Sequence, residues 1–258
     1  MRKDALKIVL ITAVAGVFGM FLRWLQNLNA FEADTGLAAA GAATSVIMLV
    51  YLLLALALFA VLTWYLLRQF EASDKVTQAL KSESKLPALL SRAGAVLLAA
   101  AGVAMMFTAH DQPHPLLTRL LAACVIVLAA SVPFLSVKEE EGKNSKNPLA
   151  LIGTLFCCVW LVCVYRDHAE DPVLWAFAVE VLAVVANTLG CYELGAYFYG
   201  RAKPARALFF AQTAAFLNLC TLTDERSTAA QALFSVFAGG MLLLEYLLLA
   251  NLQHKADK

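Results

Sequence analysis

Three carboxylates lie inside long apolar runs of this 258-residue chain: Glu180, Glu193 and Glu245. An ionisable side chain near the centre of a bilayer costs roughly 2.5–3.5 kcal/mol or more unless it is paired, so such groups mark helix-locking pairs or functional sites. Glu180 and Asn187 are seven residues apart and therefore share a helix face. Asn218 and Gln231 lie in the outer halves of the two following runs and are expected to meet that face. These four polar residues are the predicted ligand or ion path.

Two roles remain open for Glu180. A carboxylate at this depth suits proton coupling or the capture of a cationic ligand, because only Arg23 or Arg119 would lie deep enough to neutralise it. The alternative is a hydrogen bond to Asn218 or Gln231 that only holds three helices together.

Glu193 and Glu245 are expected to form structural ion pairs. Both lie in the inner third of their apolar runs, where charged groups near the membrane boundary can extend toward water. We predict that each carboxylate lies within salt-bridge distance of Arg92, Arg201 or Arg206.

Arg23 ends the first apolar run, and Glu32 and Asp34 follow in the next connection. We expect Arg23 to reach these carboxylates as a structural latch, because exposed pairs worth under roughly 1 kcal/mol still fix loops. A loop that grips a ligand is the alternative.

The known catalytic and phosphate-binding motifs are absent: no phosphate-binding loop, no Gly-x-Ser-x-Gly, no His-Glu-x-x-His and no Gly-x-Gly-x-x-Gly occurs. His110 and His114 are the nearest approach to a metal signature, but Pro113 breaks the helix that would align them. The six cysteines all fall in apolar runs without a Cys-x-x-Cys spacing. We expect no metal and no cofactor; whether the chain is an enzyme stays open, and the absence of these motifs favours a protein that is not one.

Composition sets the class of protein that positions these groups. Apolar residues make up 61% of the chain and charged residues 15%, and the apolar residues come in blocks of about twenty, the length that spans a bilayer. A net charge of +1 leaves no footprint for nucleic acid. We predict one membrane-embedded, all-α bundle, residues 1–258, with about eight transmembrane helices. The predicted spans are Ile8–Leu25, Ala39–Leu67, Pro87–Thr108, Leu117–Val137, Pro148–Tyr165, Pro172–Gly200, Ala205–Thr223 and Ala229–Leu252.

Orientation follows from the basic residues. Sixteen Lys and Arg residues lie in, or within a few residues of, the N-terminus, the C-terminus and alternate connections, and four lie in or beside the opposite connections. Because cytoplasmic loops carry the excess of basic residues, both termini are predicted to be cytoplasmic. The opposite connections hold eight carboxylates, so the outer face is expected to be acidic.

A short segment carries a resemblance. Phe21-Leu22-Arg23-Trp24, followed by the loop from Ala30 to Leu37, resembles an uncharacterised group of bacterial multi-pass membrane proteins with an F-E-x-D-T-G-L loop after the first span. The match covers about seventeen residues, and it implies only a location in the bacterial inner membrane.

Three hypotheses for function follow. The first is a transport-type protein that passes a small solute or ion along the last three spans, where Gln212 adds to the polar residues. The second is a non-catalytic accessory or sensor subunit that binds partner helices, from another membrane protein or a second copy of this chain. An intramembrane enzyme acting on lipid is third, without a catalytic signature to support it.

The orientation gives a testable prediction. A reporter fused after Lys258 should report the cytoplasm, and one fused after Asp111 should report the outside, because the basic residues are divided four to one between the two faces. Activity of the C-terminal reporter outside the membrane would contradict the even number of spans.

Overall fold

The computed structural model of this chain is an all-α bundle. It describes residues 2–31, 37, 39, 42–82, 84–112, 114–135, 148–169 and 173–254. The long helices in these ranges are α1 (Arg2–Asn29), α2 (Ala43–Gln69), α4 (Leu86–Thr108), α5 (Pro115–Ser131), α6 (Ile152–Asp167), α7 (Leu174–Phe198), α8 (Pro204–Cys220) and α9 (Thr228–Ala250). The short elements are α3 (Val76–Ala79), the 3-10 helices η1 (Ala109–Asp111), η2 (Val132–Phe134), η3 (Pro148–Leu151) and η4 (Thr221–Thr223), and the strands β1 (Phe70–Glu71) and β2 (Gln253–His254).

Seven helical segments of the described chain are long and apolar enough to cross a membrane, as expected of a multi-pass membrane protein. The remaining predicted span, Leu117–Val137, the fourth along the chain, corresponds to α5, an apolar helix of only 17 residues. At 1.5 Å per residue α5 is about 26 Å long, slightly less than the hydrocarbon thickness. It ends before the predicted boundary because Pro133 has no N–H to continue the α-helical ladder, and the chain goes on as η2.

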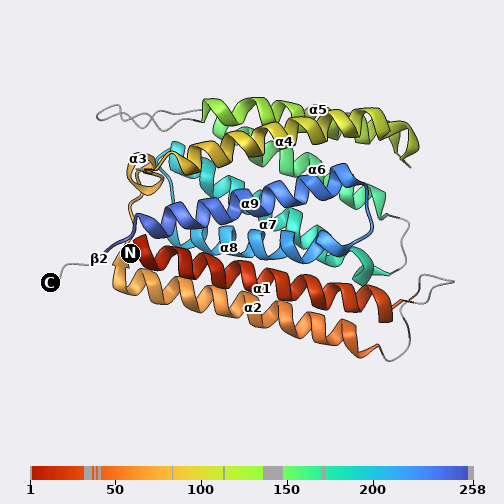
Figure 1. Ribbon diagram of the computed structural model, residues 1–258, viewed down its shortest axis with the longest axis horizontal. Helices are drawn as coiled ribbons and strands as arrows, with labels where there is room; N and C mark the ends of the chain where they lie inside the picture. Colours follow the sequence, from red (N-terminus) through yellow and green to blue (C-terminus); the bar gives the residue numbers. More distant parts are fainter. Residues whose placement is uncertain are drawn as a thin grey trace.

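The long helices lie side by side along the long axis of the molecule (Figure 1). α8 is the central helix, because it packs on α1, α2, α7 and α9. Of the residues in its apolar stretch, 67% are buried. The pair α4 and α5 forms one edge of the bundle and the pair α1 and α2 the other. The start of α1 and strand β2 lie at the same end of the molecule (Figure 1).

A small clasp closes that end of the bundle. Strand β1 pairs antiparallel with β2, and the side chain of Asn251 donates hydrogen bonds of 2.9 Å to the carbonyls of Ala79 and Lys81. These bonds tie the end of α9 to the segment between α2 and α4. We call this end the clasp end and the opposite end the far end.

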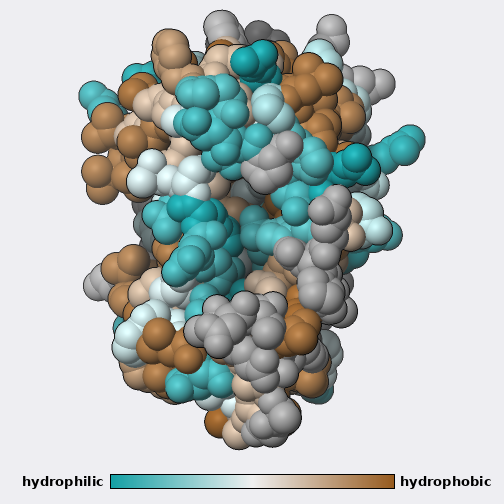
Figure 2. All heavy atoms as spheres, turned by 90° about the vertical axis from the view of Figure 1, so that its right-hand side faces the viewer, coloured by the Kyte–Doolittle hydropathy of each residue, from teal (hydrophilic) through white to brown (hydrophobic). Residues whose placement is uncertain are grey.

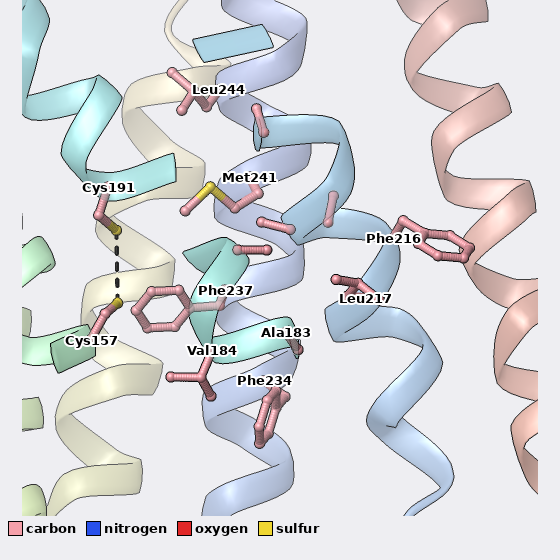
Figure 3. Close-up of a cluster of buried hydrophobic side chains, with 14 of the residues drawn as sticks. Cys157, Ala183, Val184, Cys191, Phe216, Leu217, Phe234, Phe237, Met241 and Leu244 are labelled. Carbon is pink, nitrogen blue, oxygen red and sulfur yellow. Dashed lines mark hydrogen bonds between the residues drawn. The ribbon is translucent and has the colours of Figure 1, made fainter. Parts of the chain in front are cut away.

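Aromatic and sulfur side chains join α6, α7 and α9. The ring of Trp160 on α6 lies 4.6 Å from that of Phe234 and 5.3 Å from that of Phe237, both on α9, measured between centroids. Cys157 on α6 and Cys191 on α7 face each other with 4.0 Å between their sulfurs (Figure 3). Contacts of this kind hold helices together where lipid removes the hydrophobic driving force.

Gly19 marks a close approach of α1 to α8, and this gives a stability prediction. A Cβ on Gly19 would overlap the sulfur of Cys220, whereas a Cβ on Gly239 of α9 would meet nothing within 4 Å. Gly19→Ala should therefore lower the free energy of unfolding by about 1–3 kcal/mol, because added atoms force packed helices apart. Gly239→Ala is the matched control and should change it by less than about 0.5 kcal/mol.

Thermal unfolding in detergent compares the two variants. Equal melting temperatures of Gly19→Ala and Gly239→Ala would contradict the close contact between α1 and α8 at Gly19.

Candidate functional site

Arg23 is only 1% exposed near the far end of α1, and it anchors a group of charged side chains. Its Nε donates to Asp224 Oδ1 at 2.7 Å and its Nη1 donates to Gln26 at 2.8 Å. Its Nη2 donates to the carbonyl of Ala176 on α7. Asp224 accepts a second hydrogen bond, of 3.0 Å, from Arg226. The ion cluster, as we call it, consists of Arg23, Glu180, Asp224, Arg226 and His168.

Glu180 belongs to this cluster through a partner that the sequence did not predict. Its Oε2 accepts from Arg226 at 3.3 Å and lies 3.5 Å from His168 Nε2. The expectation that only Arg23 or Arg119 could neutralise Glu180 is wrong, because the connection between α8 and α9 turns Arg226 inward, where it also lies 4.2 Å from the ring centre of Phe234. Glu180 is therefore ion-paired. Glu32 and Asp34, the predicted partners of Arg23, lie outside the described residues.

Asn187 on α7 and Asn218 on α8 form a buried amide pair. Each side-chain amide donates to the other's oxygen, at 3.0 Å and 2.7 Å, and both residues are fully buried. Asn218 also donates to the carbonyl of Ala214 at 2.7 Å. The sequence placed these two residues on one path, and the structure brings them into direct contact.

Glu245 on α9 lies in a second buried group, the carboxyl cluster, which consists of Thr12, Thr63, Gln212 and Glu245. Thr12 and Gln212 both donate to Glu245 Oε1, at 2.9 Å and 3.0 Å, and Thr63 donates to Gln212 at 3.2 Å. Glu245 Oε2 is buried without a partner in the described part of the chain. The prediction of an arginine partner for Glu245 is wrong. The two side chains that bind its carboxyl, Thr12 and Gln212, lie five and six residues from the nearest basic residues of α1 and α8, which are Lys7 and Arg206.

Glu193 has the partner that the sequence suggested. Arg206 Nε at the start of α8 donates to Glu193 Oε1 at 2.6 Å. The arginine side chain is 47% exposed and the carboxylate 2% exposed, so the pair joins α7 to α8 at the edge of the buried interior.

The three polar groups follow one another along the bundle. On α7, Glu180, Asn187 and Glu193 are separated by seven and six residues, which is about 10 Å and 9 Å along the axis. Gln212 and Asn218 on α8 are also six residues apart. The ion cluster, the amide pair and the carboxyl cluster therefore lie in that order from the far end toward the clasp end.

Two predicted residues stand apart from these groups. Gln231 is half-buried in the first turn of α9, and its side chain makes no hydrogen bond with the described residues. Arg92 is exposed on α4 and forms no ion pair within the described ranges. Both predictions rested on depth along the chain, and depth says nothing about which way a helix faces.

Sequence reasoning missed five members of the site: Thr12, Thr63, His168, Asp224 and Arg226. Thr12 and Thr63 each stand alone in apolar runs, and threonine is common on such helices because it bonds to its own backbone. The other three fall in connections, where charged residues are ordinarily solvated. The signal that could have distinguished these three residues is that their connections flank the spans that contain buried polar residues.

The far end of the molecule is where the ion cluster approaches the surface. Figure 2 shows this end, with hydrophilic residues gathered in a band across its middle and apolar residues above and below. The described charged residues nearest this end include Asp111, Arg166, Glu225 and Arg226.

No cluster of three or more His, Cys, Asp or Glu side chains that could hold a metal occurs in the described residues. A small cavity of about 10 Å³, room for about one water, lies at the clasp end beside Tyr197 and Leu208. Comparisons with protein-family models, curated proteins and solved structures find no match to this chain.

The unequal exposure of Glu193 and Arg206 predicts an asymmetry in stability. Arg206→Met should lower the free energy of unfolding by about 3–5 kcal/mol, because it leaves a buried carboxylate without its cation. Glu193→Leu should cost less than about 1 kcal/mol, because the exposed arginine can turn to water. The double variant Glu193→Leu, Arg206→Met should regain most of the unfolding free energy that Arg206→Met alone loses.

Unfolding in detergent micelles measures all three variants. Lys7→Met, which breaks an exposed pair with Asp4, is the control and should have almost no effect. Equal losses for the two single variants would contradict the asymmetry.

Proposed function

We propose that this chain is a transport-type protein of the bacterial cytoplasmic membrane that passes a small solute or ion between α1, α7, α8 and α9. The observation that supports it is the succession of the ion cluster, the amide pair and the carboxyl cluster through the interior. A bundle that only had to pack would use apolar side chains at these positions, because a polar group in a membrane interior must be paired at a cost. In this proposal, the arrangement of the described residues corresponds to a closed state.

The ion cluster is the closure at the far end. Its side chains come from α1, α7, the end of α6 and the connection between α8 and α9, so it joins four segments through ion pairs and hydrogen bonds alone. Separation of these pairs would expose the amide pair to the hydrophilic band at that end. Because the arginine and carboxylate side chains of these pairs are at most 16% exposed, opening requires that water enter from the far end and replace the partners that are lost.

The proposed orientation places the clasp end in the cytoplasm. It rests on the sixteen basic residues assigned to the termini and the connections on that side, against four on the other. The assignment to a bacterial inner membrane rests on the resemblance of the segment around Arg23.

A second candidate is a non-catalytic accessory or sensor subunit. It is favoured by the mutual pairing of Asn187 and Asn218 and by the small size of the cavity, since neither leaves room for a solute. In that case the same contacts lock the bundle permanently, and the protein acts through the helices it presents to a partner.

Access of water to the amide pair separates the two functions. In a transport-type protein, Asn187→Cys should react with a membrane-impermeant thiol reagent added to one side, because the path opens part of the time. Ala186→Cys, buried on the neighbouring face of α7, is the matched control and should react several-fold more slowly. Peptide mass spectrometry locates the label, with the buried native Cys157 as an internal reference.

If Asn187→Cys reacts no faster than Ala186→Cys from either side of the membrane, the transport proposal is overturned in favour of the accessory one.

A further inference from the structure

The carboxyl of Glu245 is fully buried, yet no cation lies against it in the described structure. Both of its donors, Thr12 and Gln212, are neutral, and both bind the same oxygen, Oε1. The other oxygen, Oε2, is buried and unpartnered. These contacts suit the protonated, neutral carboxyl group: Oε1 accepts both hydrogen bonds, and Oε2 is the oxygen that carries the hydrogen.

The charged groups of the surrounding helices lie away from Glu245. α9 packs on α8, α4, α1 and η4, and side chains of α6 and α7 also contact it. The charged residues of α6, Arg166 and Asp167, lie in its last turn at the far end, and those of α7 are Glu180 in the ion cluster and Glu193 beside Arg206. On α8 the basic residue is Arg206, which is engaged by Glu193, and on α4 it is the exposed Arg92. The charged side chains described on α1 are Asp4 and Lys7 in its exposed first turns and Arg23 in the ion cluster. η4 has no charged residue, and Asp224 beside it is paired with Arg23 and Arg226.

The small cavity lies about one helical turn nearer the clasp end than the carboxyl cluster. Its wall includes one leucine from each of three helices: Leu67, Leu208 and Leu248. These are the residues one turn nearer the clasp end than Thr63, Gln212 and Glu245, about 5–6 Å along each axis. The wall also includes Tyr197, whose hydroxyl is buried without a hydrogen-bond partner in the described chain. Ser73 and Asn251 add polar groups at its edge.

We propose that Glu245 is a proton-binding site inside the membrane, and that it exchanges its proton with the aqueous phase at the clasp end through this cavity. In the uptake step a hydronium ion that arrives by way of the cavity reaches Glu245, one of its O–H bonds breaks to leave water, and the Oε2–H bond of Glu245 forms; release is the reverse. The site itself stands on the geometry of Glu245, whereas its use as the coupling step rests on the transport function proposed above.

The donor arrangement distinguishes a proton from a metal cation. A metal ion such as Na⁺ or Ca²⁺ needs several oxygens directed at one point. Here Gln212 presents its amide nitrogen to Glu245 and turns its oxygen to Thr63. The hydroxyl of Thr12 also acts as a donor.

A hydrophobic carbodiimide tests the protonated state, because it reacts with the carboxylic acid by taking up its proton and adds a fixed mass. In the full-length protein in detergent or liposomes, the Glu245 peptide should gain this mass, less at higher pH, while the Glu193 peptide should not. Glu245→Gln should lose the modification and keep the melting temperature, since glutamine still accepts from Thr12 and Gln212. Equal modification of the two peptides would overturn the site.

Infrared spectroscopy gives a second measurement that does not depend on reagent access. The carbonyl band of a protonated carboxyl should be present in the native protein and missing in Glu245→Gln; its absence from the native protein would overturn the proposal. Transfer to heavy water should shift this band. The shift should be several-fold slower in Tyr197→Phe and unchanged in Tyr246→Phe, which alters a residue outside the cavity wall. Equal rates would overturn the route through the cavity.

The two proposals fail separately. A Glu245 band that persists while Asn187→Cys stays unlabelled would remove transport and leave the proton site. Labelling of Asn187→Cys in a protein without a protonated Glu245 would support transport and overturn the proton site.

Discussion

Burial of charge without access to water constrains this bundle more than any apolar contact does. Arg23 shows how: its guanidinium is 1% exposed and bonds within its own helix to Gln26, across to α7 at Ala176, and to Asp224 between α8 and α9. Because a buried charge is tolerated only with its partners in place, these segments have little freedom to separate while the cluster is intact. One side chain thereby fixes the far ends of helices that are more than 150 residues apart in the chain.

The same constraint explains the order of helices from centre to edge. Among the seven helical segments long and apolar enough to cross a membrane, the one that contains α8 is the least apolar and the most buried, and it contributes Gln212 and Asn218 to the polar interior. α2 is the most apolar of these helices. It contributes only Thr63 to the carboxyl cluster and has much of its surface on the outside of the bundle. Polar residues are tolerated where other helices surround them, and the outer helices supply that surrounding.

The helices could be predicted from the sequence because a run of about twenty apolar residues has few other structures available in a membrane. The amide pair of Asn187 and Asn218 was also within reach, since both residues lie at similar depth on consecutive spans. The partner of Glu245 was not. Thr12 is 233 residues away, and its contact depends on which helices are neighbours around the bundle, a property that depth and charge leave undetermined. The inward turn of Arg226 toward Glu180 is set by a connection, where sequence patterns are weakest.

Glu193 and Glu245 show how surroundings decide what one residue type can do. Each stands five residues before the clasp end of its helix, so depth alone does not separate them. Glu193 faces an arginine that reaches water, and that pairing holds its charge and its position together. Glu245 faces a hydroxyl and an amide, which bind its oxygen whether or not it carries a proton. A group whose contacts survive a change of protonation can undergo that change without unfolding its surroundings. The same cannot be said of an ion pair, because loss of the charge removes the interaction that holds it. Of the two carboxylates, Glu245 is therefore the one whose surroundings permit a cycle of proton binding and release.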